Sequence, residues 1–113
     1  MARFVRQGDI YTVNLGSPYG SEQGGIRPCI VVSNQKCCAF SDVIYIVPLT
    51  SQIKTDIPEH YILNSTFLEC DNNIVLGEQC RPIDKRRLIQ KIGYISSTQL
   101  EDIIQCIYKN FKI

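Results

Sequence analysis

The sequence predicts a mainly β fold of the α+β class: a small barrel or sandwich with an amphipathic helix at its C-terminus. Over the first two-thirds of the chain, short apolar runs alternate with clusters of turn-forming residues, which is typical of folds built from short strands. In the tail, the apolar residues recur at the spacing of a helix instead.

Length and composition set the limits of this prediction. With 113 residues the chain has the size of one domain, so we expect residues 1–113 to form a single domain. Hydrophobic residues make up 44% of it, too many for a disordered chain. The sequence has no apolar run long enough for a membrane span and no apolar signal-peptide core, so we expect a soluble, cytoplasmic protein.

The first two predicted strands flank a loop rich in glycine. Residues 9–15 alternate with a period of two, as in a strand with one buried face. Glycine, serine and proline crowd residues 16–25, which we therefore predict to be a loop. Residues 27–33 form an apolar run typical of a strand buried on both faces, and Pro28 is tolerable only at the start of such a strand.

The strongest strand prediction covers residues 42–50, where β-branched and aromatic residues run without interruption to Pro48. We expect this strand to be central in the sheet. A second loop, at residues 34–41, precedes it. Two weaker strands are predicted around residues 60–63 and 74–80.

The chain ends in a predicted helix. A helical turn at residues 83–86 leads into a strand at residues 87–95. Thr98-Gln99-Leu100-Glu101 then fits a capping box, which marks the start of a helix. The apolar residues at helical spacing are Leu100, Ile103, Ile104, Ile107, Tyr108 and Phe111. Such a stripe closes the barrel or reaches a partner subunit.

Six cysteines and one histidine raise the question of a metal site. The spacing argues against it: no Cys-x-x-Cys occurs, the adjacent Cys37 and Cys38 cannot easily hold one ion together, and His60 has no second ligand at a zinc-like spacing. We therefore predict no metal and no other cofactor. The thiols are expected to be reduced, with several of them buried.

The basic residues are unevenly distributed along the chain. Twelve Lys and Arg nearly balance eleven Asp and Glu, which gives a net charge of +1. Residues 81–91, however, contain five basic residues and one acidic residue, so this stretch carries +4 and the rest of the chain −3. Two interpretations stay open: a solvated face, or a surface for anions or nucleic acid.

Two polar residues stand at the ends of apolar runs. Arg27 lies where the glycine-rich loop enters a buried strand, and a guanidinium there needs an anion, a carboxylate or water as its partner. Thr50 ends the predicted central strand. If these two strands pair, Arg27 and Thr50 face each other across the rim of a groove; the alternative is a surface arginine and a strand-end threonine. The loop itself fits no phosphate-binding motif.

Four segments carry a family resemblance when their order and spacing are taken together. They are Gln7-Gly8-Asp9-Ile10-Tyr11, Gly20-Ser21-Glu22-Gln23-Gly24-Gly25-Ile26-Arg27-Pro28, Pro48-Leu49-Thr50-Ser51 and Gly77-Glu78-Gln79-Cys80-Arg81-Pro82-Ile83-Asp84-Lys85-Arg86-Arg87-Leu88. With them the chain resembles the MazF/PemK endoribonuclease toxins of bacterial toxin–antitoxin systems. The resemblance runs from about Arg6 through the terminal helix.

The resemblance implies an SH3-like barrel that works as a homodimer in the cytoplasm. It implies cleavage of single-stranded RNA, such as mRNA, at short sequence motifs, without a metal or other cofactor. The 2′-hydroxyl beside the scissile phosphate is then the nucleophile, and the products are a 2′,3′-cyclic phosphate and a 5′-hydroxyl. The implied protein partner is an acidic antitoxin, and DNA is bound only indirectly, through that antitoxin.

Arg27 and Thr50 match the catalytic pair of that family. Attack on a phosphodiester builds negative charge on its oxygens, which a guanidinium beside a hydroxyl stabilises. Because arginine stays protonated at neutral pH, a carboxylate is the better general base. Glu78 is the first candidate, since a related branch of the family has a carboxylate there, and Glu22 is the second. That branch also has an arginine where this chain has Leu76, so Glu78 is alternatively a structural hydrogen-bond partner.

We expect the RNA to lie between two rims, residues 17–24 and 51–58. The residues predicted to bind it are Tyr19, Ser21, Glu22, Gln23, Gly24, Ser51, Gln52, Gln79 and Arg81, the last two on the floor of the groove. The glutamines can read base edges, and Tyr19 can stack on a base. Tyr19 and Gln52 are alternatively ordinary exposed residues. The basic run Lys85-Arg86-Arg87 can contact phosphates or an acidic antitoxin tail.

Two other functions fit the same fold class. One is a non-catalytic SH3-like module that binds a peptide or nucleic acid in its groove. The other is a toxin of related fold that poisons DNA gyrase through its C-terminal helix. Arg27 beside the glycine-rich loop, together with Thr50, favours the nuclease, because a gyrase poison needs neither residue.

Overall fold

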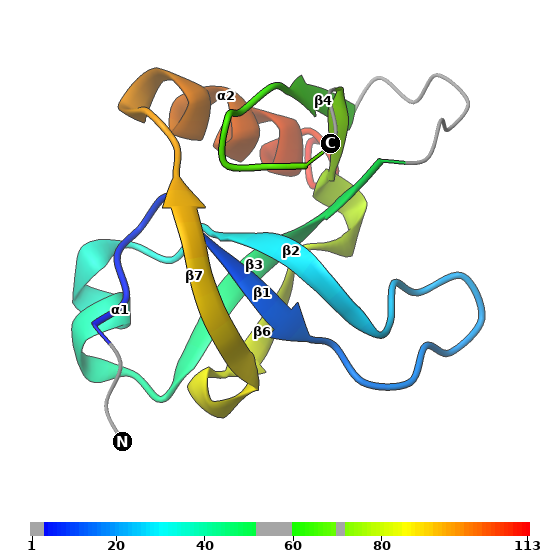
Figure 1. Cartoon of the computed structure of the whole chain (residues 1–113). Coiled ribbons are helices and arrows are strands. Elements are labelled where there is room, and N and C mark those ends of the chain that lie inside the picture. Colours follow the sequence, from blue (N-terminus) through cyan, green and yellow to red (C-terminus); the bar gives the residue numbers. More distant parts are fainter. Residues whose placement is uncertain (1–3, 52–59, 70–71) are drawn as a thin grey trace.

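The computed structural model describes residues 4–51, 60–69 and 72–113, and it contains seven antiparallel strands followed by a C-terminal helix (Figure 1). The strands are β1 (Asp9–Asn14), β2 (Ile26–Val31), β3 (Val43–Thr50), β4 (His60–Leu63), β5 (Asn73–Leu76), β6 (Arg81–Asp84) and β7 (Leu88–Tyr94). The helices are α1 (Gln35–Phe40) and α2 (Ser97–Tyr108), with single 3-10 turns at η1 (Gly77–Gln79) and η2 (Lys85–Arg87). The predicted mainly β fold with a C-terminal helix is confirmed.

Strand β3 is central, as predicted. The strands follow the order β4-β5-β3-β2-β1-β7, and β6 also pairs with β3. The first half of β3 pairs with β6, from Val43 to Ile46, whereas its end pairs with β5 at Leu49 and Thr50. One long apolar strand therefore joins both parts of the sheet, and β2 lies along its other edge.

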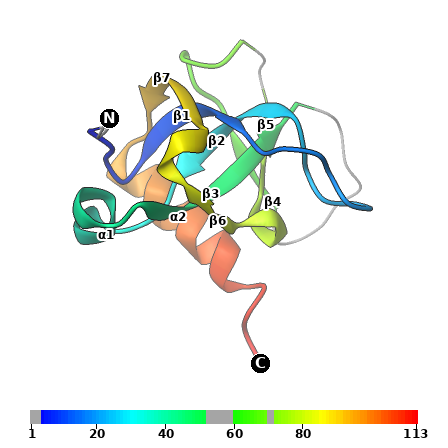
Figure 2. The same cartoon turned by 90° about the horizontal axis from the view of Figure 1, so that it is seen from below.

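The two faces of the sheet bury two separate apolar clusters. Tyr11 and Val13 of β1 belong to one cluster, whereas Ile10 of the same strand belongs to the other, as the two-residue period of a strand requires. Helix α2 covers the second cluster with Ile103 (Figures 1 and 2). The loop at residues 16–25 extends on the opposite side of the molecule from α1 in both views.

Two predictions about loops and strands were wrong. Residues 34–41, predicted to be a loop, contain α1, because the Asn34 side chain accepts a hydrogen bond from the backbone N–H of Cys37 at 2.9 Å and so caps a short helix. The strand predicted at residues 74–80 ends at Leu76. It continues as η1 and then as β6, which the sequence analysis did not identify.

The N-cap of helix α2 is Ser96, two residues before the predicted N-cap at Thr98. The capping box is formed by Ser96 and Gln99: the Ser96 hydroxyl accepts from the Gln99 N–H at 3.1 Å, and the Gln99 side chain accepts from the Ser96 N–H at 3.0 Å. Phe111, predicted to lie on the apolar stripe, follows the end of the helix and is 74% exposed.

Several cysteines are buried, as expected because free cysteine is among the most buried residue types. Cys29, Cys38 and Cys106 are buried, whereas Cys37 is exposed.

No helix in the described segments is long and apolar enough to cross a membrane.

The Cys29 thiol makes the stability depend on pH. Burial raises its pKa from 9.0 to about 12, although Arg81 and Arg27 act in the opposite direction. Above pH 9.0 the unfolded thiol loses its proton while the folded one keeps it. The free energy of unfolding should therefore fall as the pH rises towards the folded pKa, by at most about 1.4 kcal/mol per pH unit for this group.

Urea unfolding of the wild type and of Cys29→Ala at a series of pH values on either side of 9.0 measures this effect. We expect the variant to be less stable at neutral pH, because it leaves a cavity, and to lose stability less steeply in alkali. Parallel pH profiles for the two proteins would contradict the assignment to Cys29.

Candidate functional site

The pairing of β2 with β3 places Arg27 opposite Thr50. The ladder runs from Val31 opposite Ile46 to Cys29 opposite Pro48, and the same antiparallel register continued by two residues sets Arg27 against Thr50. Residues opposite each other in an antiparallel pair have their side chains on the same face. The two strands are thus the paired neighbours that the sequence hypothesis required.

A hydrogen bond to the glycine-rich loop orients the Arg27 side chain. Its Nε donates to the carbonyl oxygen of Gly24 at 2.9 Å. The terminal guanidinium nitrogens make no hydrogen bond to another described residue. Arg27 is partly buried, and Thr50 is only 4% exposed. The arrangement leaves the charged, planar guanidinium of Arg27 beside the end of β3, which carries the Thr50 hydroxyl.

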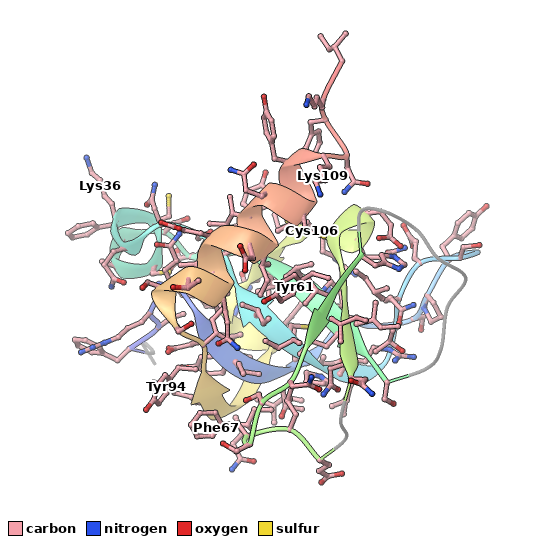
Figure 3. All side chains as sticks on the ribbon, turned by 90° about the horizontal axis from the view of Figure 1, so that it is seen from above. Lys36, Tyr61, Phe67, Tyr94, Cys106 and Lys109 are labelled. Carbon is pink, nitrogen blue, oxygen red and sulfur yellow. The ribbon has the colours of Figure 1, made fainter. Side chains whose placement is uncertain are left out.

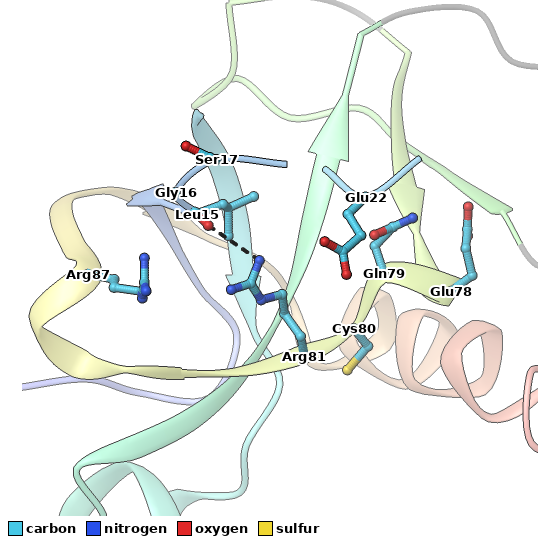
Figure 4. A pocket seen from close by; sticks show the side chains of 9 residues that line it. All are labelled: Leu15, Gly16, Ser17, Glu22, Glu78, Gln79, Cys80, Arg81 and Arg87. Carbon is cyan, nitrogen blue, oxygen red and sulfur yellow. Dashed lines mark hydrogen bonds between the residues drawn. The ribbon is translucent and has the colours of Figure 1, made fainter. Parts of the chain in front are cut away.

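The predicted site residues line two pockets, and Arg27 and Thr50 belong to the same one. We call the first the polar pocket; it has a volume of about 490 Å³ and is lined by Leu15, Gly16, Ser17, Glu22, Glu78, Gln79, Cys80, Arg81 and Arg87 (Figure 4). The second, the aromatic pocket, has a volume of about 480 Å³, and its lining includes Arg27, Thr50, Ser51, Phe67 and Gln90. The structure therefore divides many of the predicted site residues between two pockets.

Charged side chains of both signs face the polar pocket. Arg81 donates from Nη1 to the carbonyl oxygen of Leu15 at 3.4 Å, and the Glu22 carboxylate extends towards Arg81 (Figure 4). One oxygen of Glu22 accepts from the backbone N–H of Tyr19 at 3.1 Å. Glu22 thus holds the turn of its own loop and presents a carboxylate to the pocket.

Gln79 was predicted to read base edges, but its side chain is bonded to the loop. Its carbonyl oxygen accepts from the Gln23 N–H at 3.3 Å, and its NH₂ group donates to the Ser21 carbonyl oxygen at 3.4 Å. These contacts tie η1 to a loop more than fifty residues away in sequence. The Gln79 amide therefore fixes the position of the predicted RNA-binding loop.

Glycine is required at one point of that loop. A Cβ on Gly24 would lie 2.4 Å from the Pro18 side chain, so no other residue fits without moving the loop. The loop is closed at its base by the Gly25 N–H, which donates to the Gly16 carbonyl oxygen at 2.7 Å. The carbonyl that Arg27 contacts thus belongs to a tightly fixed segment.

Glu78 is engaged by His60, a partner that the sequence analysis did not identify. His60 Nε2 lies 2.9 Å from both carboxylate oxygens of Glu78. In Figure 4 Glu78 lies at the far end of the polar pocket from Arg87. No local signal relates two residues 18 positions apart; the pairing of β4 with β5, which places His60 opposite Leu76, brings them together.

The other predicted contacts vary in their surroundings. Tyr19 is 85% exposed, and Ser21 and Ser51 are exposed as well. The Gln23 side-chain oxygen is buried and has no hydrogen-bond partner within the described segments. Gln52 lies outside the described residues, as does the rest of the rim predicted at residues 52–58.

Much of the basic run is bound to neighbouring groups. Lys85 donates to the Cys38 carbonyl oxygen at 2.6 Å. The Arg86 guanidinium donates two hydrogen bonds to Asp84 and its backbone N–H donates a third, and together they lower the pKa of that carboxyl to about 2. Arg81 and Arg87 are the members of the run that line the polar pocket. Part of the run is therefore bound within the protein, and its use as a surface for anions or nucleic acid stays a prediction.

Among the described residues, no three His, Cys, Asp or Glu side chains lie together as the ligands of a metal ion do. Phe67 and Gln90, which line the aromatic pocket, were not predicted from the sequence. Neither residue lies in a segment with a functional motif.

Comparison with known proteins gives consistent results for sequence and structure. The model of the PemK-like, MazF-like toxins of type II toxin–antitoxin systems matches residues 6–111. The chain is 33% identical over 105 residues to Endoribonuclease MazF of Staphylococcus saprophyticus, a match that covers 91% of this chain and 88% of that protein.

Two solved structures show the same fold at lower identity. MazF of Deinococcus radiodurans has a TM-score of 0.83 at 21% identity, with 98% of this chain and 99% of that chain covered. An endoribonuclease from a mycobacterial species, in complex with its cognate antitoxin, has a TM-score of 0.76 at 20% identity, with 95% and 94% covered.

The role of Gln79 in holding the loop can be tested by amide hydrogen exchange. Gln79→Ala removes the acceptor of the Gln23 N–H, so we expect this amide to exchange roughly fivefold faster, the equivalent of one hydrogen bond of about 1 kcal/mol. NMR of the RNA-free protein measures it. Gln79→Glu keeps an acceptor and should retain part of the protection, while Gln90→Ala is the matched control. Unchanged exchange in Gln79→Ala would show that the loop is held by other contacts.

Proposed function

The chain belongs to the PemK-like, MazF-like toxin family of type II toxin–antitoxin systems, as an endoribonuclease toxin, and we propose that it cuts single-stranded RNA, mRNA included, at short sequence motifs. The observation that carries the proposal is the juxtaposition of Arg27 and Thr50 on paired strands, where both line the aromatic pocket. Unpaired RNA can enter such a groove with its bases splayed, which a duplex cannot do.

We propose that the 2′-hydroxyl of the RNA is the nucleophile. Its oxygen forms a bond to the neighbouring phosphorus, and the bond from phosphorus to the 5′-oxygen breaks. The products are a 2′,3′-cyclic phosphate and a 5′-hydroxyl. Because the nucleophile belongs to the substrate, the reaction needs no metal-activated water, which supports metal-independent cleavage.

Arg27 and Thr50 are suited to stabilise the transition state. The non-bridging oxygens gain negative charge as the 2′-oxygen attacks, and the terminal nitrogens of Arg27 with the Thr50 hydroxyl can donate to them. The bond from Arg27 Nε to Gly24 fixes the guanidinium before the substrate arrives. Donors fixed in advance need no reorganisation during the reaction.

The two candidate bases differ in their contacts. Both oxygens of Glu78 lie within hydrogen-bond distance of His60, whereas Glu22 uses one oxygen for the Tyr19 N–H and faces the polar pocket. These contacts support Glu22 as the group that removes the proton from the 2′-hydroxyl. Glu78 is then a structural partner of His60 and the second candidate.

We further propose a homodimer in the cytoplasm, regulated by an acidic antitoxin. Two of the similar structures, the mycobacterial endoribonuclease and a MazE–MazF complex of Deinococcus radiodurans, are complexes with an antitoxin. Arg81 and Arg87 in the polar pocket offer an acidic segment the same positive groups that phosphates would use. DNA contact is then indirect, through the antitoxin, and residues 1–113 act as one domain.

Replacing Arg27 tests the proposal directly. Arg27→Ala should lower RNA cleavage by about a thousandfold or more, since it removes the positive group that stabilises the negative charge of the transition state. The assay is a long single-stranded RNA incubated with the protein in EDTA, with the fragment ends mapped for cyclic phosphate and 5′-hydroxyl. Arg86→Ala is the matched control, because Arg86 contacts Asp84 outside the pockets. Intact RNA with folded wild-type protein would refute the nuclease function.

The choice between the two carboxylates gives a second test. Glu22→Gln should lower kcat by about 10²-fold or more, as expected on loss of a general base. Glu78→Gln should change kcat by less than about tenfold while lowering Tm, because it weakens a hydrogen bond to a partly buried His60. Both variants keep an amide oxygen as acceptor. The reverse order of kcat losses would assign the base to Glu78.

A further inference from the structure

An exposed aromatic ring stands beside Arg27 and Thr50. Phe67, in the segment between β4 and β5, lines the aromatic pocket with both of them and is 42% exposed. Its ring centroid lies 5.1 Å from that of Tyr94, and the two rings lie side by side at one edge of the molecule (Figure 3).

The backbone of β7 is shaped to hold this ring. A Cβ on Gly93 would lie 2.2 Å from Cγ of Phe67, so only glycine at this position lets the ring rest on the strand. Tyr94 supports the ring from the side at an interplanar angle of 47°. One part of the Phe67 ring is thus packed, and the rest is open to solvent.

We propose that Phe67 is the stacking platform for one unpaired base of the RNA, on a nucleotide next to the scissile phosphate. This inference rests on the proposed nuclease function. The aromatic pocket, at about 480 Å³, falls in the size range of small-molecule sites. A phosphate held by Arg27 and Thr50 brings its own base to the same pocket, and aromatic side chains are a recurrent platform on which proteins stack an unpaired base.

The composition of the pocket favours a nucleotide over a second copy of the chain. Its lining includes the side chains of Thr12 and Gln90, which suit the polar edge of a base. A protein surface that filled the pocket would also cover Arg27 and Thr50 and so exclude the substrate from them. The molecule that occupies the pocket during the reaction is therefore the RNA itself.

The test measures binding apart from cleavage. The probe is a short single-stranded RNA with a cleavage motif of the wild type, a 2′-deoxy sugar at the scissile nucleotide and the fluorescent base 2-aminopurine at a neighbouring position. Stacking on Phe67 should quench the fluorescence. Phe67→Ala should abolish this quenching and weaken binding by about ten- to a hundredfold.

Three further variants make the test specific. Phe67→Trp should retain quenching and affinity, while Phe67→Leu keeps an apolar side chain without an aromatic face and should behave like Phe67→Ala. Phe40→Ala is the matched control, since Phe40 on α1 is 84% exposed and lies outside both pockets. It should bind RNA as the wild type does.

The outcomes separate this inference from the proposed function. Equal quenching and affinity in Phe67→Ala and Phe40→Ala, with the wild type still cutting RNA, would overturn only the role of Phe67. A Phe67→Ala protein with altered oligomeric state but normal RNA affinity would assign the pocket to a protein interface and overturn the inference as well. If the wild type neither bound nor cut RNA, the proposed nuclease function itself would be wrong.

Discussion

The register of β2 against β3 is the constraint on which the candidate site depends. It is fixed by buried side chains: Ile30 faces Val47 across the ladder, and both are fully buried under α2. A slip by one residue would turn these side chains to the opposite face of the sheet. The apolar core therefore also determines that Arg27 stands opposite Thr50.

The glycine-rich loop connects this pair to the polar pocket. Arg27 is bonded to Gly24, the neighbouring Gln23 is bonded to Gln79, and Gln79 follows Glu78, which is bonded to His60. Side chains from β2 and η1 thus bind the loop, and β4 is linked to η1 through the contact of His60 with Glu78. Glycine often makes a loop flexible, but Gly24 instead allows the loop to pack closely against Pro18. A site assembled in this way is largely formed before a substrate arrives.

Much of the fold, and part of the site, could be predicted from the sequence. The strands and α2 were predictable because their apolar periods are local, and the positions of Arg27 and Thr50 at strand ends followed from the same pattern. Asn34 as a helix cap and the break of the strand after Leu76 were missed, because short elements carry little periodic signal. Gln79 on the loop, His60 on Glu78 and Phe67 on Gly93 depend on contacts between residues far apart in sequence. Only the folded structure reveals such contacts.

The position of the scissile phosphate tests most directly whether the β2–β3 register builds the site. A crystal structure of the protein with a short single-stranded RNA, made uncleavable by a 2′-deoxy sugar at the scissile nucleotide, would locate it. We expect a non-bridging oxygen of that phosphate within hydrogen-bond distance, about 3 Å, of both the Arg27 guanidinium and the Thr50 hydroxyl. A phosphate bound in the polar pocket and out of reach of both residues would contradict this.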